Sequence, residues 1–537
     1  MTSAMDLNSK KLFLAILLLV GALIFLFNLG GRDLWEPDET RYAVVAREMR
    51  ESGNWILPHL NGKIYAEKPP LFFWLVNFSV FFLGEDSELA NRLPSALAGF
   101  LTMIITFFLG KRLYNARAGF FSALILATCF LFPQLSRWMM MDSLFTLFFL
   151  ITLFYFYLGY EDEKGQQKYY FMAGFFMGLG TLTKGPIAYL PISILLLYSF
   201  IQKDPKKTWN LNLFYGFIIS LAVVLIWFIP ACWIGGEAYR DKILFGQTLG
   251  RLIEGGKHFH VKPFFFYFIR FPLEFFPWTI FLPSVFVFAL KDVKSRDKKF
   301  LLVWFITVFL FFTLSKGKKD NYILPLYPAA ALLVGALWDS ELDSNKRSKK
   351  LLAGLIFLTS LFLMIFILAL PGIPNRSYPA IEPYRLLALG IVSYLLAGSL
   401  LSTLFFMKRR GWASLICLAL TFTFFHLHLS YALPQRLNDQ RSMRPFSERI
   451  LKRMEKGDEL KVVFFRPTGL YYYTRRPFTE EIWDQCRFEK VLKSSNRVYF
   501  VIQKRDLDQL KKDLRIEIYP IEQMKVGHWD LVLISNR

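Results

Sequence analysis

The first residues able to carry chemistry lie just after the first apolar segment, within residues 30–68. Asp38 and Glu39 follow Pro37, where a helix is expected to begin, and Arg41 comes three residues after Asp38. Acidic residues at a helix start often only cap free backbone N–H groups. Because Arg41 shares a helix face with Asp38, a second role is open. A carboxylate here can act as a general base, and the arginine can stabilise negative charge.

Two further acidic positions lie at the edges of apolar segments. Glu67 and Lys68 precede a pair of prolines, where a lysine often only reaches toward the membrane surface. Asp142 follows a run of methionines at the start of another apolar segment, where helix capping is the simple explanation. Ionisable groups beside a membrane are costly and commonly mark functional sites. These residues are therefore candidates for catalysis and binding.

Basic residues in two other connections point to an anionic ligand. Lys184 lies in the reversal Thr183–Pro186, where a turn needs the glycine and proline but not the lysine. Tyr322 follows three lysines, which form either an anion site or a solvated charge cluster: Lys316, Lys318 and Lys319. The long connection 233–270 contains His258 and His260, a spacing more typical of polar loop residues than of metal ligands.

Composition places these residues in a membrane protein that crosses the bilayer many times. The chain has 537 residues, 54% of them hydrophobic and 20% charged, with a mean hydropathy of +0.35. Apolar segments of about 17–25 residues recur, which is the length that spans the hydrocarbon. The net charge of +22 falls largely in short loops between these segments. This is the positive-inside pattern, with anionic lipid as a further partner, and it does not indicate nucleic acid.

The hydrophobic pattern predicts about thirteen spans within residues 1–432. Every second connection is basic, which places the N-terminus in the cytoplasm and the candidate residues on the periplasmic side of the inner membrane. The short block 69–83 is predicted to be a membrane-embedded or interfacial helix that does not change sides. The expected spans are 11–29, 92–110, 118–136, 141–159, 168–183, 186–201, 210–232, 271–290, 299–315, 322–338, 351–370, 384–407 and 411–432.

Residues 433–537 are charged and contain no apolar segment long enough to span. Short apolar runs at 462–465, 498–502 and 531–534 predict strands, and helical spacing is seen at Phe446 and Ile450. We therefore expect a small periplasmic α/β domain after a mainly α-helical transmembrane bundle.

Seven motifs occur in a fixed order between residues 10 and 340. Together they resemble the bacterial branch of the protein O-mannosyltransferase-related, type C glycosyltransferases, and within it the aminoarabinose transferases that modify lipid A. The C-terminal portion resembles that family only in layout, and the sequence Lys319–Asn321 is more polar than the family's pattern. The motifs are PDETRYA (37–43), EKPPL (67–71), NRLPSALAG (91–99), MDSLFT (141–146), TKGPI (183–187), HVKPFFFY (260–267) and SKGKKDNYILPLYP (315–328).

The resemblance implies a role for each matched residue. Asp38 corresponds to the catalytic aspartate, with Glu39 beside it, and Asp142 to a second important acid. Three residues map to groups around the donor phosphate: Arg41, Lys68 and Tyr322. Glu67 and His260 correspond to a candidate pair of ligands for a divalent cation, and whether the reaction needs a metal is left open by the sequence.

The implied activity is transfer of a sugar from undecaprenyl phosphate to lipid A or a related glycolipid, with inversion at the anomeric carbon. Polyprenyl phosphate is already a good leaving group, so it needs cations (Arg41, Lys68 and Lys184) and a hydrogen bond from Tyr322. Asp38 would deprotonate a hydroxyl acceptor, or orient an acceptor phosphate. A lipid or sugar transporter, and a glycosyltransferase acting on protein, remain alternatives. No residue pattern identifies the sugar or the acceptor.

Overall fold

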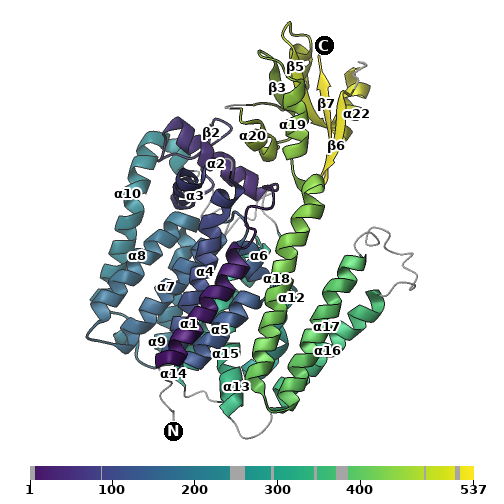
Figure 1. The fold of residues 1–537 in the computed structure, drawn as a ribbon. Coiled ribbons are helices and arrows are strands. Elements are labelled where there is room, and N and C mark those ends of the chain that lie inside the picture. The colour runs from purple at the N-terminus through teal and green to yellow at the C-terminus, as the bar shows by residue number, and fades with distance from the viewer. Residues whose placement is uncertain are drawn as a thin grey trace. The chain divides into compact units, whose positions relative to one another are not determined.

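The computed structural model describes residues 7–85, 87–241, 243, 261–291, 295–343, 348–369, 385–476, 479–514 and 520–536. The chain is mainly helical and ends in a small mixed sheet (Figure 1). It forms two compact units, each built from separate stretches of the chain. The helical unit comprises Met1–Phe27, Ser95–Ile229 and Asp241–Leu429. The mixed unit comprises Asn28–Pro94, Pro230–Arg240 and Ser430–Arg537.

Each predicted span coincides with a helix or with consecutive helical elements. Eight of the described helices are long and apolar enough to cross a membrane. The number is nine if Phe266–Glu274 and Trp278–Lys291 together form one span, bent by 111°. The elements are α1 (Leu7–Gly21), η1 (Ala22–Leu26), α4 (Glu88–Leu113), α5 (Ala116–Thr128), α6 (Leu131–Ser136), α7 (Asp142–Glu161), α8 (Gln166–Lys184), η2 (Pro186–Tyr189), α9 (Leu190–Ile201), η3 (Pro205–Lys207), α10 (Leu211–Asp241), α12 (Phe266–Glu274), η5 (Trp278–Phe281), α13 (Leu282–Lys291), α14 (Arg296–Leu314), η6 (Asp320–Leu326), α15 (Tyr327–Asp343), α16 (Lys349–Ala369), α17 (Arg385–Met407) and α18 (Gly411–Arg441).

Helix α15 and the η6 turn before it lie at the centre of the helical unit, since 94% of the apolar stretch within Asp320–Leu342 is buried, against 22% of the stretch within Lys349–Leu368. Small residues permit this close packing. A Cβ on Gly335 of α15 would collide with Ser122 Oγ on α5, and one on Gly110 would come within 2.7 Å of Gly119 Cα. Without a hydrophobic force between helices in lipid, such close approach is what holds them together.

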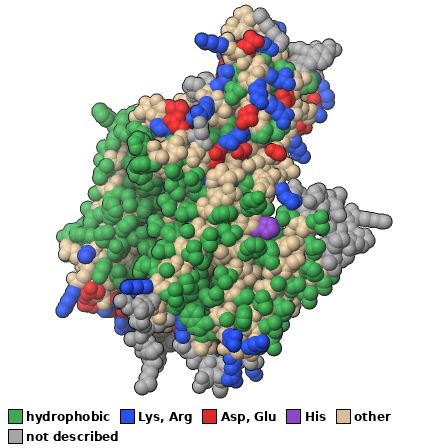
Figure 2. Space-filling model, in the orientation of Figure 1, with side chains coloured by type: hydrophobic (Ala, Val, Ile, Leu, Met, Phe, Trp, Pro, Cys, Tyr) green, Lys and Arg blue, Asp and Glu red, His purple; other side chains and the backbone are tan. Residues whose placement is uncertain are grey.

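The described charges of the helical unit are concentrated at helix ends. Tyr157 near the end of α7 donates a 2.5 Å hydrogen bond to Asp297 at the start of α14, and Lys207 pairs with Glu163 at 2.9 Å. Figure 2 shows Lys and Arg side chains at the lower end of this unit and a broad apolar band above them. The connections at this end are the basic ones that the sequence assigns to the cytoplasm.

The mixed unit joins the segment after the first span to the C-terminal residues. Its N-terminal part contains α2 (Asp38–Ser52), the hairpin β1 (His59–Leu60) and β2 (Lys63–Ile64), and α3 (Leu71–Leu83). Helix α3 has 13 residues. At the usual rise per residue its length is about 20 Å, which is shorter than the hydrocarbon layer. This length favours the predicted interfacial placement of α3, which remains a prediction.

The C-terminal part of the mixed unit is the expected α/β structure. Its sheet has the order β4-β3-β5-β7-β6, with β3 parallel to β4 and β5, and β7 antiparallel to β5 and β6. The three predicted strands fall on β3, β5 and β7. The elements are α19 (Arg444–Arg453), β3 (Glu459–Val463), α20 (Thr468–Thr474), β4 (Glu480–Ile482), α21 (Gln485–Leu492), β5 (Val498–Gln503), α22 (Lys504–Leu514), β6 (Glu522–Val526) and β7 (Trp529–Ser535).

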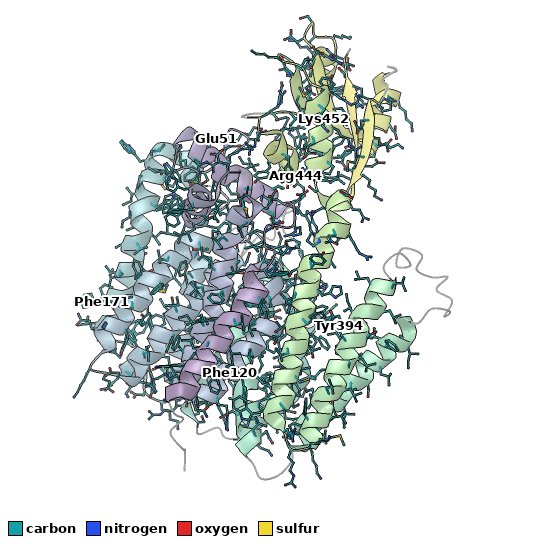
Figure 3. The ribbon with its side chains drawn as sticks, viewed as in Figure 1. Glu51, Phe120, Phe171, Tyr394, Arg444 and Lys452 are labelled. Atoms are coloured by element: carbon teal, nitrogen blue, oxygen red, sulfur yellow. The ribbon has the colours of Figure 1, made fainter. Side chains whose placement is uncertain are left out.

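Ion pairs tie the two parts of the mixed unit together. Arg444, labelled in Figure 3 at the start of α19, pairs with Glu88 and, at 3.0 Å, with Asp33. The sequence predicted the helix at Phe446 and Ile450, both of which are buried. It did not predict that the C-terminal residues cluster with the loop that contains Asp38.

Candidate functional site

The first group of predicted residues comes together in the mixed unit, at the start of α2. Asp38 is in the first turn of this helix, and its carboxylate forms an ion pair with Arg41 one turn later. A second Arg41 nitrogen, Nη1, lies 3.7 Å from Glu67 Oε2, and the Tyr65 hydroxyl donates to the same oxygen at 3.4 Å. The guanidinium therefore lies between two carboxylates that are distant in sequence.

Aromatic packing positions this group. The ring of Tyr42 meets Phe72 and Phe73 of α3 edge-on, with centroids 6.1 and 6.0 Å apart, and the Arg41 guanidinium carbon is 5.2 Å from the Tyr42 centroid. The ring of Tyr65 also meets Phe73 edge-on, at 6.2 Å. These contacts fix α2 against the start of α3. Lys68 precedes α3 by two prolines, next to Glu67 and partly exposed.

Glu39 is engaged in a different set of contacts from Asp38. Its side chain is fully buried, and its carboxylate pairs with Arg92 at 2.7 Å and Arg32 at 2.9 Å and accepts the Trp35 N–H at 3.1 Å. Burial by itself opposes ionisation of Glu39, but the charges of Arg32 and Arg92 outweigh it and lower its pKa to about 2. Such a carboxylate holds the loop before α2 in place, so we assign Glu39 a positioning role and propose no direct part for it in the reaction.

Replacing Glu39 with Gln is expected to destabilise the protein by about 3–5 kcal/mol, because a buried arginine would be left charged and unpaired. That arginine is Arg92, whose side chain is only 1% exposed. Thermal unfolding in detergent measures this change. Because the folded pKa of Glu39 lies below the unfolded value of 4.5, its stabilisation is complete above that pH and is lost as the pH falls toward 2.

The matched control is Glu85→Gln, which breaks the 3.0 Å pair between Arg50 and a carboxylate that is 60% exposed. Exposed pairs of this kind contribute little, so this variant should unfold almost as wild type does. Equal shifts in the unfolding of the two variants would contradict the positioning role of Glu39.

The second group of predicted residues comes together in the helical unit. Asp142 begins α7 and Lys184 ends α8, and Lys184 Nζ lies 2.5 Å from Asp142 Oδ1. Both side chains are buried, at 4% and 9% exposed. Lys184 Nζ also lies 5.0 Å from the ring centroid of Tyr322 on η6 and 5.2 Å from that of Phe145. Three residues from separate helical elements thus form one polar site among aromatic rings.

A further polar cluster, which sequence reasoning missed, anchors the segment carrying Tyr322. Arg270 Nε lies 3.0 Å from Asp320 Oδ1, and its Nη2 contacts the other Asp320 oxygen. This is a bidentate pair, which fixes geometry as well as charge. Arg270 Nε also lies 3.1 Å from Glu274 Oε1, and Tyr327 donates to Glu274 at 3.4 Å. The only signal in the sequence was an arginine and a glutamate four residues apart in an aromatic run.

The metal-binding hypothesis receives no support from the described residues. Glu67 lies in the Arg41 group, but His260 and its neighbour His258 lie outside the described residues. Within the described ranges, no group of three or more His, Cys, Asp or Glu side chains is arranged to hold a metal ion. The contacts of Glu67 that the structure shows are with an arginine and a tyrosine.

Comparisons with known proteins identify the relatives of this chain. A family profile described as dolichyl-phosphate-mannose-protein mannosyltransferase matches residues 67–234. An undecaprenyl phosphate-alpha-4-amino-4-deoxy-L-arabinose arabinosyl transferase from Serratia proteamaculans is 30% identical over 443 residues, or 79% of this chain and 77% of that protein.

Two solved structures share the fold. The ArnT protein from Cupriavidus metallidurans, solved bound to undecaprenyl phosphate, has a TM-score of 0.80 at 21% identity, over 99% of this chain and 98% of that one. The Archaeoglobus fulgidus oligosaccharyltransferase has a TM-score of 0.53 at 14% identity, over 93% and 70%. The predicted fold class, a type C glycosyltransferase bundle with a small C-terminal sheet, is thereby confirmed. This chain belongs to the family of the undecaprenyl phosphate-alpha-4-amino-4-deoxy-L-arabinose arabinosyl transferases and is a multi-pass membrane glycosyltransferase.

Proposed function

We propose that the protein transfers 4-amino-4-deoxy-L-arabinose from undecaprenyl phosphate to lipid A or a closely related glycolipid, on the periplasmic side of the inner membrane. The observation that carries this proposal is the Asp38–Arg41–Glu67 group, in which a carboxylate and a guanidinium are held together at a helix start. The sugar and its carrier are taken from the name of the Serratia relative.

We assign residues of both groups to one displacement, because their motifs match those of the family. The acceptor oxygen forms a bond to the anomeric carbon, while the bond from that carbon to the phosphate oxygen breaks and leaves its electron pair on undecaprenyl phosphate. Arg41, Lys68 and Lys184 are the cations assigned to that phosphate, with Tyr322 donating a hydrogen bond. Single displacement from the opposite side gives inversion, by analogy with inverting glycosidases.

Asp38 is assigned to the acceptor. If the acceptor group is a hydroxyl, its proton passes to the Asp38 carboxylate as the new bond forms. If the acceptor group is a phosphate, it is already anionic and Asp38 orients it. Asp142 neutralises Lys184 in the ground state. We therefore propose that Asp142 positions the Lys184 ammonium group. The pair also offsets the cost of burying a lysine whose side chain is only 9% exposed.

Lys68→Ala is expected to raise the KM for the polyprenyl donor by about tenfold or more, because one charge-assisted contact to phosphate is lost. The folding of the protein should change little, since the side chain is partly exposed. Initial rates at varied donor concentration measure the effect. Lys63→Ala is the control, since the Lys63 side chain is 61% exposed and pairs with Glu481 at 3.4 Å. An unchanged KM for Lys68→Ala would remove this residue from the donor site.

Mass spectrometry of lipid A from cells with and without the gene tests the assignment of sugar and acceptor. Lipid A carrying an added aminoarabinose only when the protein is present is the expected result. A different added sugar would contradict the assignment of the donor. Unmodified lipid A together with a modified protein would contradict the assignment of the acceptor.

A further inference from the structure

Helix α20 of the C-terminal part is attached to the residues on both sides of Asp38. Thr468 Oγ1 donates to Glu36 Oε2 at 2.7 Å, and the Gly469 N–H donates to the other oxygen of that carboxylate. The Thr468 hydroxyl is also 2.7 Å from Thr40 Oγ1. Glu36 lies two residues before Asp38 and Thr40 two residues after it. The position of the first turn of α2 therefore depends on the position of α20.

The other end of α20 is held by a second residue of α2. Arg47, which is 8% exposed, donates from Nη1 to the Tyr472 carbonyl at 3.0 Å and from Nη2 to the Tyr471 carbonyl at 3.1 Å. Backbone groups near both ends of α20 are thereby satisfied by side chains of the α2 segment. Attachment at two separate points, Glu36 and Arg47, fixes both the distance and the direction of α2 relative to α20.

The loop that carries Glu67 and Lys68 is attached to the same C-terminal stretch. Asn61, at the tip of the β1–β2 hairpin, donates to the Thr479 carbonyl at 2.8 Å and accepts the Thr479 N–H at 2.9 Å. The Asn61 N–H in turn donates to Glu48 of α2 at 2.7 Å. The hairpin is therefore held between α2 and the stretch before β4.

The contact between Gly469 and Glu36 is tightly packed. A Cβ on Gly469 would lie 2.8 Å from Met443 Cβ and 2.9 Å from Glu36 Oε1, so only glycine brings its N–H this close to the carboxylate. A tightly packed contact of this kind transmits a displacement of one side to the other.

We infer that helix α20 and Thr479 of the C-terminal part are positioning elements for the reaction, in which Thr468 and Gly469 hold the Asp38–Arg41 turn through Glu36 while Thr479 holds the Glu67–Lys68 loop through Asn61. The inference rests on the proposed function for the identity of the reaction. It assigns a role in catalysis to a part of the chain in which the sequence offered no site residue.

The test is Thr468→Val, which preserves the shape of the side chain and removes the hydroxyl. We expect kcat to fall by about tenfold, because a small misplacement of catalytic groups is costly. Thr468→Ser should restore most of the rate. The matched control is Thr474→Val, on the same helix, whose buried hydroxyl donates to the Leu470 carbonyl of α20 itself at 2.7 Å.

Hydrogen exchange of purified protein supplies a readout that needs no activity. In Thr468→Val, the amides of residues 34–45 should exchange faster than in wild type, whereas Thr474→Val should leave them unchanged. Unchanged exchange and unchanged kcat in Thr468→Val would overturn the inference, and so would an equal loss of kcat in both valine variants. If wild type transfers no sugar, the proposed function fails, and the exchange result alone then decides whether α20 positions this turn.

Discussion

Asp38→Asn is expected to lower the rate of sugar transfer by at least about a hundredfold for a hydroxyl acceptor, because an amide cannot accept the proton that a general base removes. The protein should remain folded in the membrane, since the Asp38 side chain is 20% exposed and the amide retains the shape of the carboxylate. Transfer of radiolabelled sugar by purified variants, normalised to folded protein, measures the loss.

The control for this variant is Glu51→Gln, at the opposite end of α2 (Figure 3). The Glu51 side chain is 52% exposed and its carboxylate lies 3.7 Å from Arg47. Because exposed pairs contribute little, its replacement should leave transfer unchanged. Full activity in Asp38→Asn would remove Asp38 from the reaction. A loss of activity only with a hydroxyl acceptor, and not with a phosphate acceptor, would identify Asp38 as the base and not as an orienting group.

Lys184→Gln is expected to have the second large effect, on both stability and transfer. The carboxylate of Asp142, 4% exposed, would lose its ammonium partner. Leaving a buried charge unpaired costs about 3–5 kcal/mol. The change also removes one of the cations assigned to the leaving phosphate, so transfer should fall by at least about tenfold. Thermal unfolding in detergent and steady-state rates measure the two effects separately.

The double variant Asp142→Asn with Lys184→Gln separates structure from function. A neutral pair of similar shape should recover most of the stability, since no unpaired charge remains. If Lys184 acts on the donor phosphate, transfer stays low although the fold is restored. Recovery of both stability and full activity would show that the pair is only structural.

The sequence predicted the helices and part of each site, because hydrophobic length and charge alternation depend on local residues. The charge pattern placed Asp142, Lys184 and Tyr322 on the same side of the membrane as the Asp38 loop, which remains a prediction, and the structure brings these three residues together. It could not predict that Lys184 pairs with Asp142, because that contact depends on how α7 packs against α8. The number of helices that cross the bilayer remains a prediction.

Other contacts could not be predicted because no motif or unusual residue type marks the residues that make them. Glu39 and Asp38 are adjacent acids, and only the positions of Arg32 and the buried Arg92 show that Glu39 is held by two ion pairs. Thr468 lies 432 positions after Glu36, in a stretch with no catalytic motif. Such contacts depend on tertiary packing between distant segments, which no local pattern encodes.

The central claim is that the protein moves a sugar off its lipid carrier and does not carry the lipid across the bilayer. The most direct measurement follows radiolabelled sugar on undecaprenyl phosphate in vesicles that contain the purified protein and lipid A. We predict label on lipid A with wild-type protein and almost none with Asp38→Asn. Label that changes leaflet while still attached to undecaprenyl phosphate, with lipid A unlabelled, would contradict the claim.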